Sequence, residues 1–223
     1  MRVASALESF LQNFYNGECL SEVDAKKNLE LGVVEIVGKK GHLANGLLVT
    51  SNGYFLTAKH CVDHEPKKMK KRKIRLHDQQ EYAFEKVCVW SEERDVALAK
   101  ATMPGECKPM LYKFCNTSVK LKEQPLLVLT RWDGKLTLRS SMLEKHLKRK
   151  LYFKGEIYAS YGDSVPGDSG GSLVSLDGRV MGIHTHTLKG NSPIFDLYGS
   201  TKIVEALEVM SVYCGHLKKR MKK

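Results

Sequence analysis

The spacing of hydrophobic residues along the chain changes near residue 31. Before that point apolar side chains recur at helical spacing, which predicts an amphipathic helix over residues 4–15. The stripe consists of Ala4, Leu7, Phe10, Leu11 and Phe14. Ser21 is followed three residues later by Asp24, an arrangement that caps helices, so a second short helix is expected to start there. Residues 1–30 are therefore predicted to form a helical N-terminal segment.

From residue 31 onward, short runs rich in Val, Ile, Leu and aromatic residues alternate with Gly, Asn and Asp, a pattern typical of all-β proteins. In the first half the predicted strands cover residues 33–37, 46–50, 54–57, 74–76, 87–90 and 96–100. After a less regular stretch around 104–122 they cover 126–130, 136–139, 151–158, 172–175, 180–184 and 194–198. Two β domains, 31–115 and 116–200, are expected, each a barrel or a sandwich.

Helical spacing returns at the C-terminus. Ile203, Val204, Leu207 and Met210 form an apolar stripe, and Ser200 or Thr201 is expected to cap the helix. The chain ends in a basic run, so residues 201–223 are predicted to be a helix with a basic tail.

Composition narrows the protein class. With 42% hydrophobic and 27% charged residues among 223, the chain is an ordinary globular protein, neither collagen-like nor of low complexity. The longest apolar runs are as short as 126–129, so no membrane span is expected. The first ten residues lack the pattern of a secretory signal. We therefore expect the cytoplasm or another reducing compartment.

The cysteines support the same expectation. The chain has six, with neither a CxxC pair nor the Cys/His spacing of a zinc site. They are interpreted as separate reduced thiols, with a disulfide framework as the alternative. No metal and no cofactor are expected.

Basic residues exceed acidic ones by 36 to 25, a formal net charge of +11. The densest run extends from Lys67 to Lys73, and further clusters lie at 145–150 and 218–223. Such runs are either solvated surface or weak binding sites for nucleic acid or another acidic surface. Few aromatic residues accompany them and no nucleic-acid-binding motif is present, so both interpretations stay open.

Three segments carry the residue types of serine catalysis, in the order His, Asp, Ser. They are Leu-Thr-Ala-Lys-His-Cys at 56–61, Arg-Asp-Val-Ala-Leu at 94–98 and Gly-Asp-Ser-Gly-Gly-Ser at 167–172. A serine nucleophile needs an imidazole base and a buried carboxylate that orients it, and His60, Asp95 and Ser169 supply these groups. Glycines let the last segment turn so that the amides of Gly167 and Ser169 converge on one oxyanion.

With these motifs the chain resembles the trypsin-like, chymotrypsin-fold serine proteases over about residues 31–210. Lys59 and Val96 stand where the usual motifs have Ala and Ile, and 167–171 matches the nucleophile loop. The resemblance implies an all-β fold of two antiparallel six-stranded barrels, with the helical N-terminal segment and the C-terminal helix added. It also implies that His60, Asp95 and Ser169 are catalytic.

The chain departs from the secreted digestive enzymes of this family. Asn45 and Val165 stand near the positions where those enzymes carry disulfide cysteines, and 36–38 is interpreted as strand rather than as an activated N-terminus. The stretch 44–57 is more similar to the HtrA-type, glutamyl-endopeptidase and viral branches, which lack the usual zymogen step. A viral protein or bacterial effector would work in a host cytosol.

Two features predict opposite substrate preferences. Asp163 lies six residues before Ser169, where trypsin-type enzymes place the carboxylate that binds Lys or Arg. His184 resembles the histidine that binds Glu or Gln in glutamyl endopeptidases and viral main proteases, and Ser164 has the offset of its hydroxyl partner. Imidazole can donate to a carboxylate or amide but gives a cation no benefit. We therefore expect cleavage after Glu or Gln, with an Asp163–His184 pair as one way for both residues to serve it.

The function expected from the sequence is a serine endopeptidase that acts on protein or peptide substrates through an acyl-enzyme. Its predicted substrate-binding residues are Ser164, His184, Asp163 and Thr187. Two alternatives stay open at this point. One is cleavage after Lys or Arg using Asp163, and the other is an inactive relative that binds nucleic acid or a protein through its basic surface.

Overall fold

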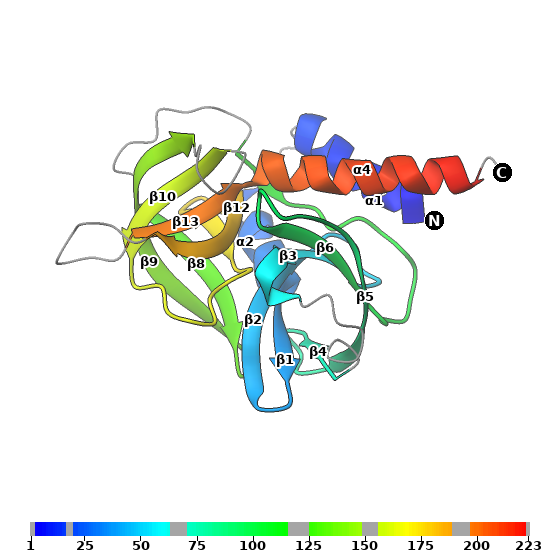
Figure 1. Ribbon diagram of the computed structural model, residues 1–223, viewed down its shortest axis with the longest axis horizontal. Helices are drawn as coiled ribbons and strands as arrows, with labels where there is room; N and C mark the ends of the chain where they lie inside the picture. Colours follow the sequence, from blue (N-terminus) through cyan, green and yellow to red (C-terminus); the bar gives the residue numbers. More distant parts are fainter. Residues whose placement is uncertain are drawn as a thin grey trace.

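The computed structural model describes residues 3–16, 20–62, 71–115, 125–148, 156–188 and 197–221. Two β-barrels lie side by side, with the first helix and the C-terminal helix packed across one side (Figure 1). Parts of the strands predicted at 151–158 and 194–198, and most of the basic run from Lys67, lie outside the described residues.

The first barrel contains six strands. They are β1 (Val33–Gly38), β2 (Gly41–Leu48), β3 (Tyr54–Ala58), β4 (Lys73–Arg75), β5 (Glu81–Ser91) and β6 (Val96–Ala101). They close in the order β1-β2-β3-β6-β5-β4, and every pairing is antiparallel. β3 and β6 are buried along their whole length. One face lies inside the barrel, as at Phe55 and Ala97, and the other faces the helices, as at Leu56 and Leu98.

The second barrel closes through β11. Its strands are β8 (Pro125–Trp132), β9 (Lys135–Lys148), β10 (Glu156–Gly162), β11 (Ser172–Ser175), β12 (Arg179–Leu188) and β13 (Leu197–Lys202). The order is β11-β8-β9-β10-β13-β12, and β11 also pairs with β12. The predicted class of two six-stranded antiparallel barrels is confirmed. The sequence did not predict β7 (Lys113–Phe114), a short strand that joins β12 in parallel.

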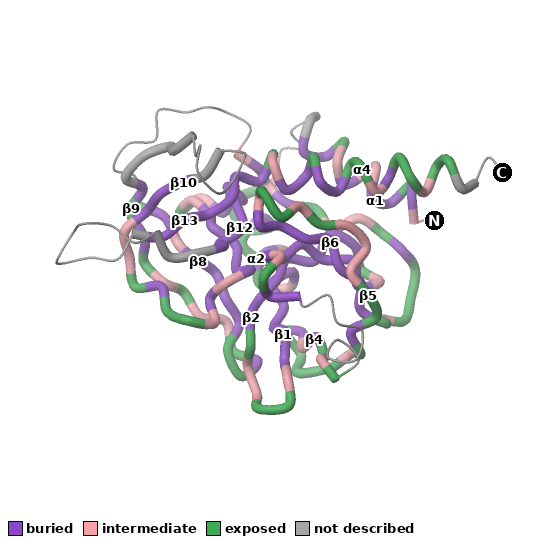
Figure 2. The backbone as a smooth tube through the Cα atoms, viewed as in Figure 1, coloured by how far each residue is buried: buried purple, intermediate pink, exposed green. Residues whose placement is uncertain are grey.

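Both predicted N-terminal helices are present. α1 covers Val3–Asn16 and packs on the C-terminal helix, while α2 covers Glu22–Gly32. The amide of Asp24 donates to Ser21 Oγ over 3.1 Å, which confirms the predicted cap. Leu7, Phe10 and Phe14 are buried in a core between the helices and the barrels. Figure 2 shows the buried residues along the barrel strands, with the β1–β2 tip exposed.

The predicted start of the C-terminal helix is wrong. α4 covers Ile203–Met221, and Ser200 and Thr201 belong to β13 instead of capping it. The hydroxyl of Thr201 donates to the Arg94 carbonyl over 2.7 Å. In the predicted stripe Ile203, Leu207 and Met210 are buried, whereas Val204 is 36% exposed. The strand therefore continues directly into the helix.

The cysteines that the structure describes are free thiols, namely Cys61, Cys88, Cys107, Cys115 and Cys214. Cys19 lies outside the described residues. Within the described chain, no helix combines the length and the apolar character needed to cross a membrane.

Candidate active site

Strand register brings His60 and Asp95 together. β3 pairs antiparallel with β6 so that Ala58 lies opposite Val96, which leaves His60 just beyond the end of one strand and Asp95 just before the other. His60 lies in η1 (Lys59–Cys61), a single 3₁₀ turn. The amide of His60 donates to Asp95 Oδ1 over 3.0 Å, and its Nδ1 lies 2.7 Å from Asp95 Oδ2. The carboxylate therefore orients the imidazole from two directions.

The pair is buried at the carboxylate and open at the ring. The side chain of Asp95 is 8% exposed and that of His60 is 47% exposed. The hydrogen bond with Asp95 raises the pKa of His60, although desolvation opposes it. Because a carboxylate only accepts, Nδ1 carries a proton and Nε2 is the nitrogen left for proton transfer.

The Ser169 loop is attached to both barrels. The amide of Asn45 in β2 donates to the Ser169 carbonyl over 2.8 Å, and the amide of Gly170 donates to the His184 carbonyl over 2.7 Å. Gly170 has φ +82°, and a Cβ there would lie 2.5 Å from Thr57 Oγ1. Only glycine permits this approach. Since Thr57 lies three residues before His60, the loop reaches the His60 end of β3.

Two amides of this loop lack partners within the described structure. Neither Gly167 nor Ser169 donates a backbone hydrogen bond to another described residue. Gly167 has φ +106° in a turn that the Asp168 amide closes on the Val165 carbonyl over 3.1 Å. The hydroxyl of Ser169 lies 3.5 Å from the Thr185 carbonyl. The loop therefore has donors available for a ligand.

An ion pair between a half-buried arginine and a buried carboxylate supports the loop. Asp168 is fully buried, and its Oδ2 accepts hydrogen bonds from Arg139 Nε over 3.1 Å and from the Val165 amide over 2.8 Å. Ser164 Oγ lies 3.3 Å from the same oxygen. No sequence motif indicates Arg139, because an arginine on a barrel strand has no local signature.

The structure brings together the predicted pair of Ser164 and His184. Ser164 Oγ lies 2.8 Å from His184 Nε2, and Ser200 Oγ lies 3.3 Å from its Nδ1. His184 is 3% exposed and its backbone is bonded to the Ser169 loop on both sides. Tyr198 donates to the Ser164 carbonyl over 2.7 Å. The imidazole is thus held beside the loop by hydroxyl groups.

The predicted Asp163–His184 pair does not form. Asp163 is exposed, and its carboxylate makes no hydrogen bond or ion pair with a described residue. Asp163 directly follows β10, and its amide extends the pairing with β9 by donating to the Ser140 carbonyl over 3.2 Å. Thr187 lies in β12, but its side chain lies outside the described residues.

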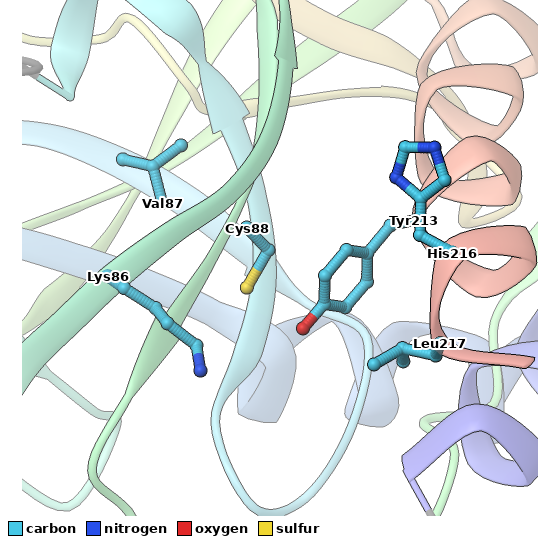
Figure 3. Close-up of a pocket in the computed structure, with 6 residues that line it drawn as sticks. All are labelled: Lys86, Val87, Cys88, Tyr213, His216 and Leu217. Atoms are coloured by element: carbon cyan, nitrogen blue, oxygen red, sulfur yellow. The ribbon is translucent and has the colours of Figure 1, made fainter. Parts of the chain in front are cut away.

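One pocket lies away from the predicted site residues. A pocket of about 220 Å³ lies between β5 and α4, where Cys88 and Tyr213 point toward one another (Figure 3). Burial raises the pKa of Cys88 to about 11, so this thiol is a poor nucleophile at neutral pH. The described residues also contain no cluster of three or more His, Cys, Asp or Glu side chains that could hold a metal.

The comparisons with known proteins agree with this geometry. The family model named Trypsin matches residues 24–204, which is most of the chain. A search of curated protein sequences gives no match.

Solved structures show the same fold. The HtrA-type protease AlgW with decapeptide has a TM-score of 0.67 at 17% identity, covering 88% of this chain and 68% of that chain. The active form of the Rv3671c protease from M. tuberculosis has a TM-score of 0.65 at 17% identity, with coverages of 84% and 82%. Its inactive form has a TM-score of 0.63 at 18% identity, with coverages of 85% and 92%. With the family model matching most of its length, the chain belongs to the trypsin family of serine endopeptidases.

Proposed function

We propose that Ser169 is the nucleophile of this endopeptidase, that His60 is its general base, and that Asp95 orients His60. The observation that carries the proposal is the His60–Asp95 pair at the end of β3, which is joined by two hydrogen bonds. The Ser169 loop is attached to the adjacent strand, β2. His60 Nε2 takes the proton of Ser169 Oγ as the oxygen attacks the substrate carbonyl. The imidazolium then protonates the leaving amine, and water hydrolyses the acyl-enzyme.

The amides of Gly167 and Ser169 complete this mechanism. Negative charge develops on the carbonyl oxygen during attack, and donors that are already oriented stabilise it without reorganisation. Both amides lack another partner among the described residues. We therefore assign the oxyanion hole to them.

The test of the triad is covalent labelling with a fluorophosphonate, followed by turnover measurements. Wild type should be labelled at Ser169, while Ser169→Ala should keep its fold and lose labelling. Ser169→Ala and His60→Ala should each lower kcat by about 10⁶-fold, and the double variant by little more, because the groups act as one unit. Additive losses would contradict a mechanism shared by the two residues. An unlabelled wild type that binds RNA in a salt-dependent way would favour the inactive-relative alternative.

For the substrate we propose cleavage after Glu or Gln, whose side chain is bound by His184. Its hydroxyl partners support this assignment. Ser164 donates to Asp168, so its oxygen accepts from His184 and Nε2 carries a proton. A substrate carboxylate or amide oxygen accepts this proton in place of Ser164, or shares it with that hydroxyl. A substrate lysine would meet a donor there and gain nothing. The exposed position of Asp163 gives no support to the Lys or Arg alternative.

Peptides that differ only in a Glu, Gln, Lys or Arg before the cleaved bond test this preference. Wild type should cleave after Glu or Gln, and His184→Ala should lower kcat/KM for those peptides by about 10- to 100-fold, the loss expected for one charged or polar hydrogen bond. Asp163→Ala is the matched control and should change kcat/KM little. A preference for Lys or Arg that survives His184→Ala would contradict the proposal.

A further inference from the structure

A second imidazole–carboxylate pair, His42 and Glu35, contacts the Ser169 loop. His42 in β2 places Nδ1 2.9 Å from Glu35 Oε1 and Nε2 3.0 Å from the Gly167 carbonyl oxygen. The side chains of His42 and Glu35 are 4% and 0% exposed. The carbonyl of Gly167 also accepts from Asn45 Nδ2 over 2.9 Å. The residue assigned to the oxyanion hole is therefore held by two side chains of the other barrel.

Both atoms that face the His42 ring are acceptors. A carbonyl oxygen has no proton, and an ionised carboxylate only accepts. Neutral imidazole has one N–H, so it can satisfy one of these contacts and leaves two lone pairs facing each other in the other. Only the imidazolium donates to Glu35 and Gly167 at the same time.

The surroundings of Glu35 keep it ionised. Besides His42 it accepts from the amides of Asp133 and Gly134 over 3.1 and 2.9 Å and from Arg75 over 3.1 Å. Burial raises the pKa of Glu35, but the hydrogen bonds from His42 and Gly134 and the charge of Arg75 outweigh it, so the pKa is lowered. Glu35 therefore acts as an acceptor toward every neighbour.

Other groups packed around the ring complete its electrostatic setting. Trp132 from β8 stacks on it with a centroid distance of 4.1 Å and an interplanar angle of 24°, an arrangement that favours a cation. Arg75 from β4 and Arg131 from β8 oppose the charge, and both lie near Glu35. Asp168, next to Gly167, is already neutralised by Arg139. Glu35 remains the carboxylate in direct contact with the ring.

We propose that His42 is a positioning residue that works as an imidazolium and holds the Gly167 carbonyl, so that the oxyanion loop keeps its active conformation. This inference rests on the proposed function. Glycine at φ +106° has a wide conformational choice, so its orientation depends on what its carbonyl contacts. Loss of the His42 proton replaces one of two hydrogen bonds with repulsion. Because oxyanion binding develops in the transition state, kcat should fall while KM changes little.

The protonation state is tested directly by NMR of the histidine ring nitrogens in ¹⁵N-labelled protein, with His42→Gln used for assignment. We expect both nitrogens of His42 to carry protons at pH 7.5, where a free imidazole, with a pKa of about 6.5, is mostly neutral. A single protonated nitrogen at pH 7.5 would overturn the inference. This measurement needs no substrate, so it stays decisive if the chain labels no serine and cleaves no peptide, an outcome that contradicts the proposed function instead.

Kinetics test the consequence. In wild type, kcat should decline by about 10- to 100-fold at alkaline pH, as expected when a catalytic donor is misplaced. Glu35→Gln removes the charge that stabilises the imidazolium, so the decline should move to lower pH. His42→Gln keeps one amide donor that does not titrate, so the decline should disappear. His77→Gln, the same change at an exposed histidine, is the control. An alkaline decline that is identical in wild type and both variants would overturn the inference.

Discussion

In its proposed role as general base, His60 acts only when its Nε2 is unprotonated, and the Asp95 carboxylate opposes this by stabilising the imidazolium. The same contact provides orientation, because two hydrogen bonds from one carboxylate fix both the backbone and the ring of His60. A raised pKa also makes His60 a stronger base once it is deprotonated. The contact with Asp95 therefore lowers the fraction of His60 that can act as a base at low pH, but it makes the deprotonated ring a stronger base.

The increase of kcat/KM with pH should reflect the raised pKa of His60. We expect kcat/KM to increase with pH around a midpoint above 6.5, the ordinary value for histidine, because the pKa of His60 is raised. Asp95→Asn removes the charge, so the midpoint should move to lower pH while the plateau falls by about 10⁴-fold, since the ring loses its orientation. A series of pH–rate measurements on both proteins checks this. An unchanged midpoint in Asp95→Asn would show that another group sets the rise.

At the scale of strands and helices, local patterns predicted most elements, and their errors have a common cause. Strand β11 has the predicted bounds, because period-two alternation and turn residues are local signals. Ser200 and Thr201 look like caps in the sequence, but their hydroxyls contact His184 and Arg94. These contacts span 16 and 107 residues. No local pattern could indicate them.

In the candidate site, too, local motifs could be recognised in the sequence and contacts between distant residues could not. Its motifs predicted His60, Asp95 and Ser169, whereas the residues that hold the loop were missed. Asn45 was noted only as a position where related secreted enzymes have a cysteine, yet its amide and side chain contact Ser169 and Gly167. β2 thereby attaches the Ser169 loop to the first barrel with hydrogen bonds, near the position where the secreted enzymes carry a disulfide cysteine.

At the scale of the whole molecule, one buried arginine joins the second barrel to α2 and β1. Arg131 in β8 is 3% exposed, and its guanidinium donates to the carbonyls of Val33, Gly134 and Glu30 over 2.9, 2.8 and 2.7 Å. Its amide donates to Asn45 Oδ1 over 2.6 Å. Burial lowers its pKa, although nearby carboxylates oppose this. The carbonyl of Glu30 lies near the C-terminal end of α2, where a cation is favourable.

Replacing Arg131 with Met should therefore destabilise both barrels together. The change leaves a long apolar side chain but removes a hydrogen bond from each of three carbonyls, of which Gly134 keeps the one from Gln79 Nε2. We expect a loss of about 3 to 5 kcal/mol in the free energy of unfolding. Denaturant titration followed by fluorescence should show a single transition at a lower midpoint. Arg179→Met is the matched control, because Arg179 is 47% exposed and pairs with Asp177 at the surface. Its loss should stay below about 1 kcal/mol. If Arg131→Met unfolds at the midpoint of this control, or if its second barrel unfolds in a separate transition, Arg131 does not join the two barrels energetically.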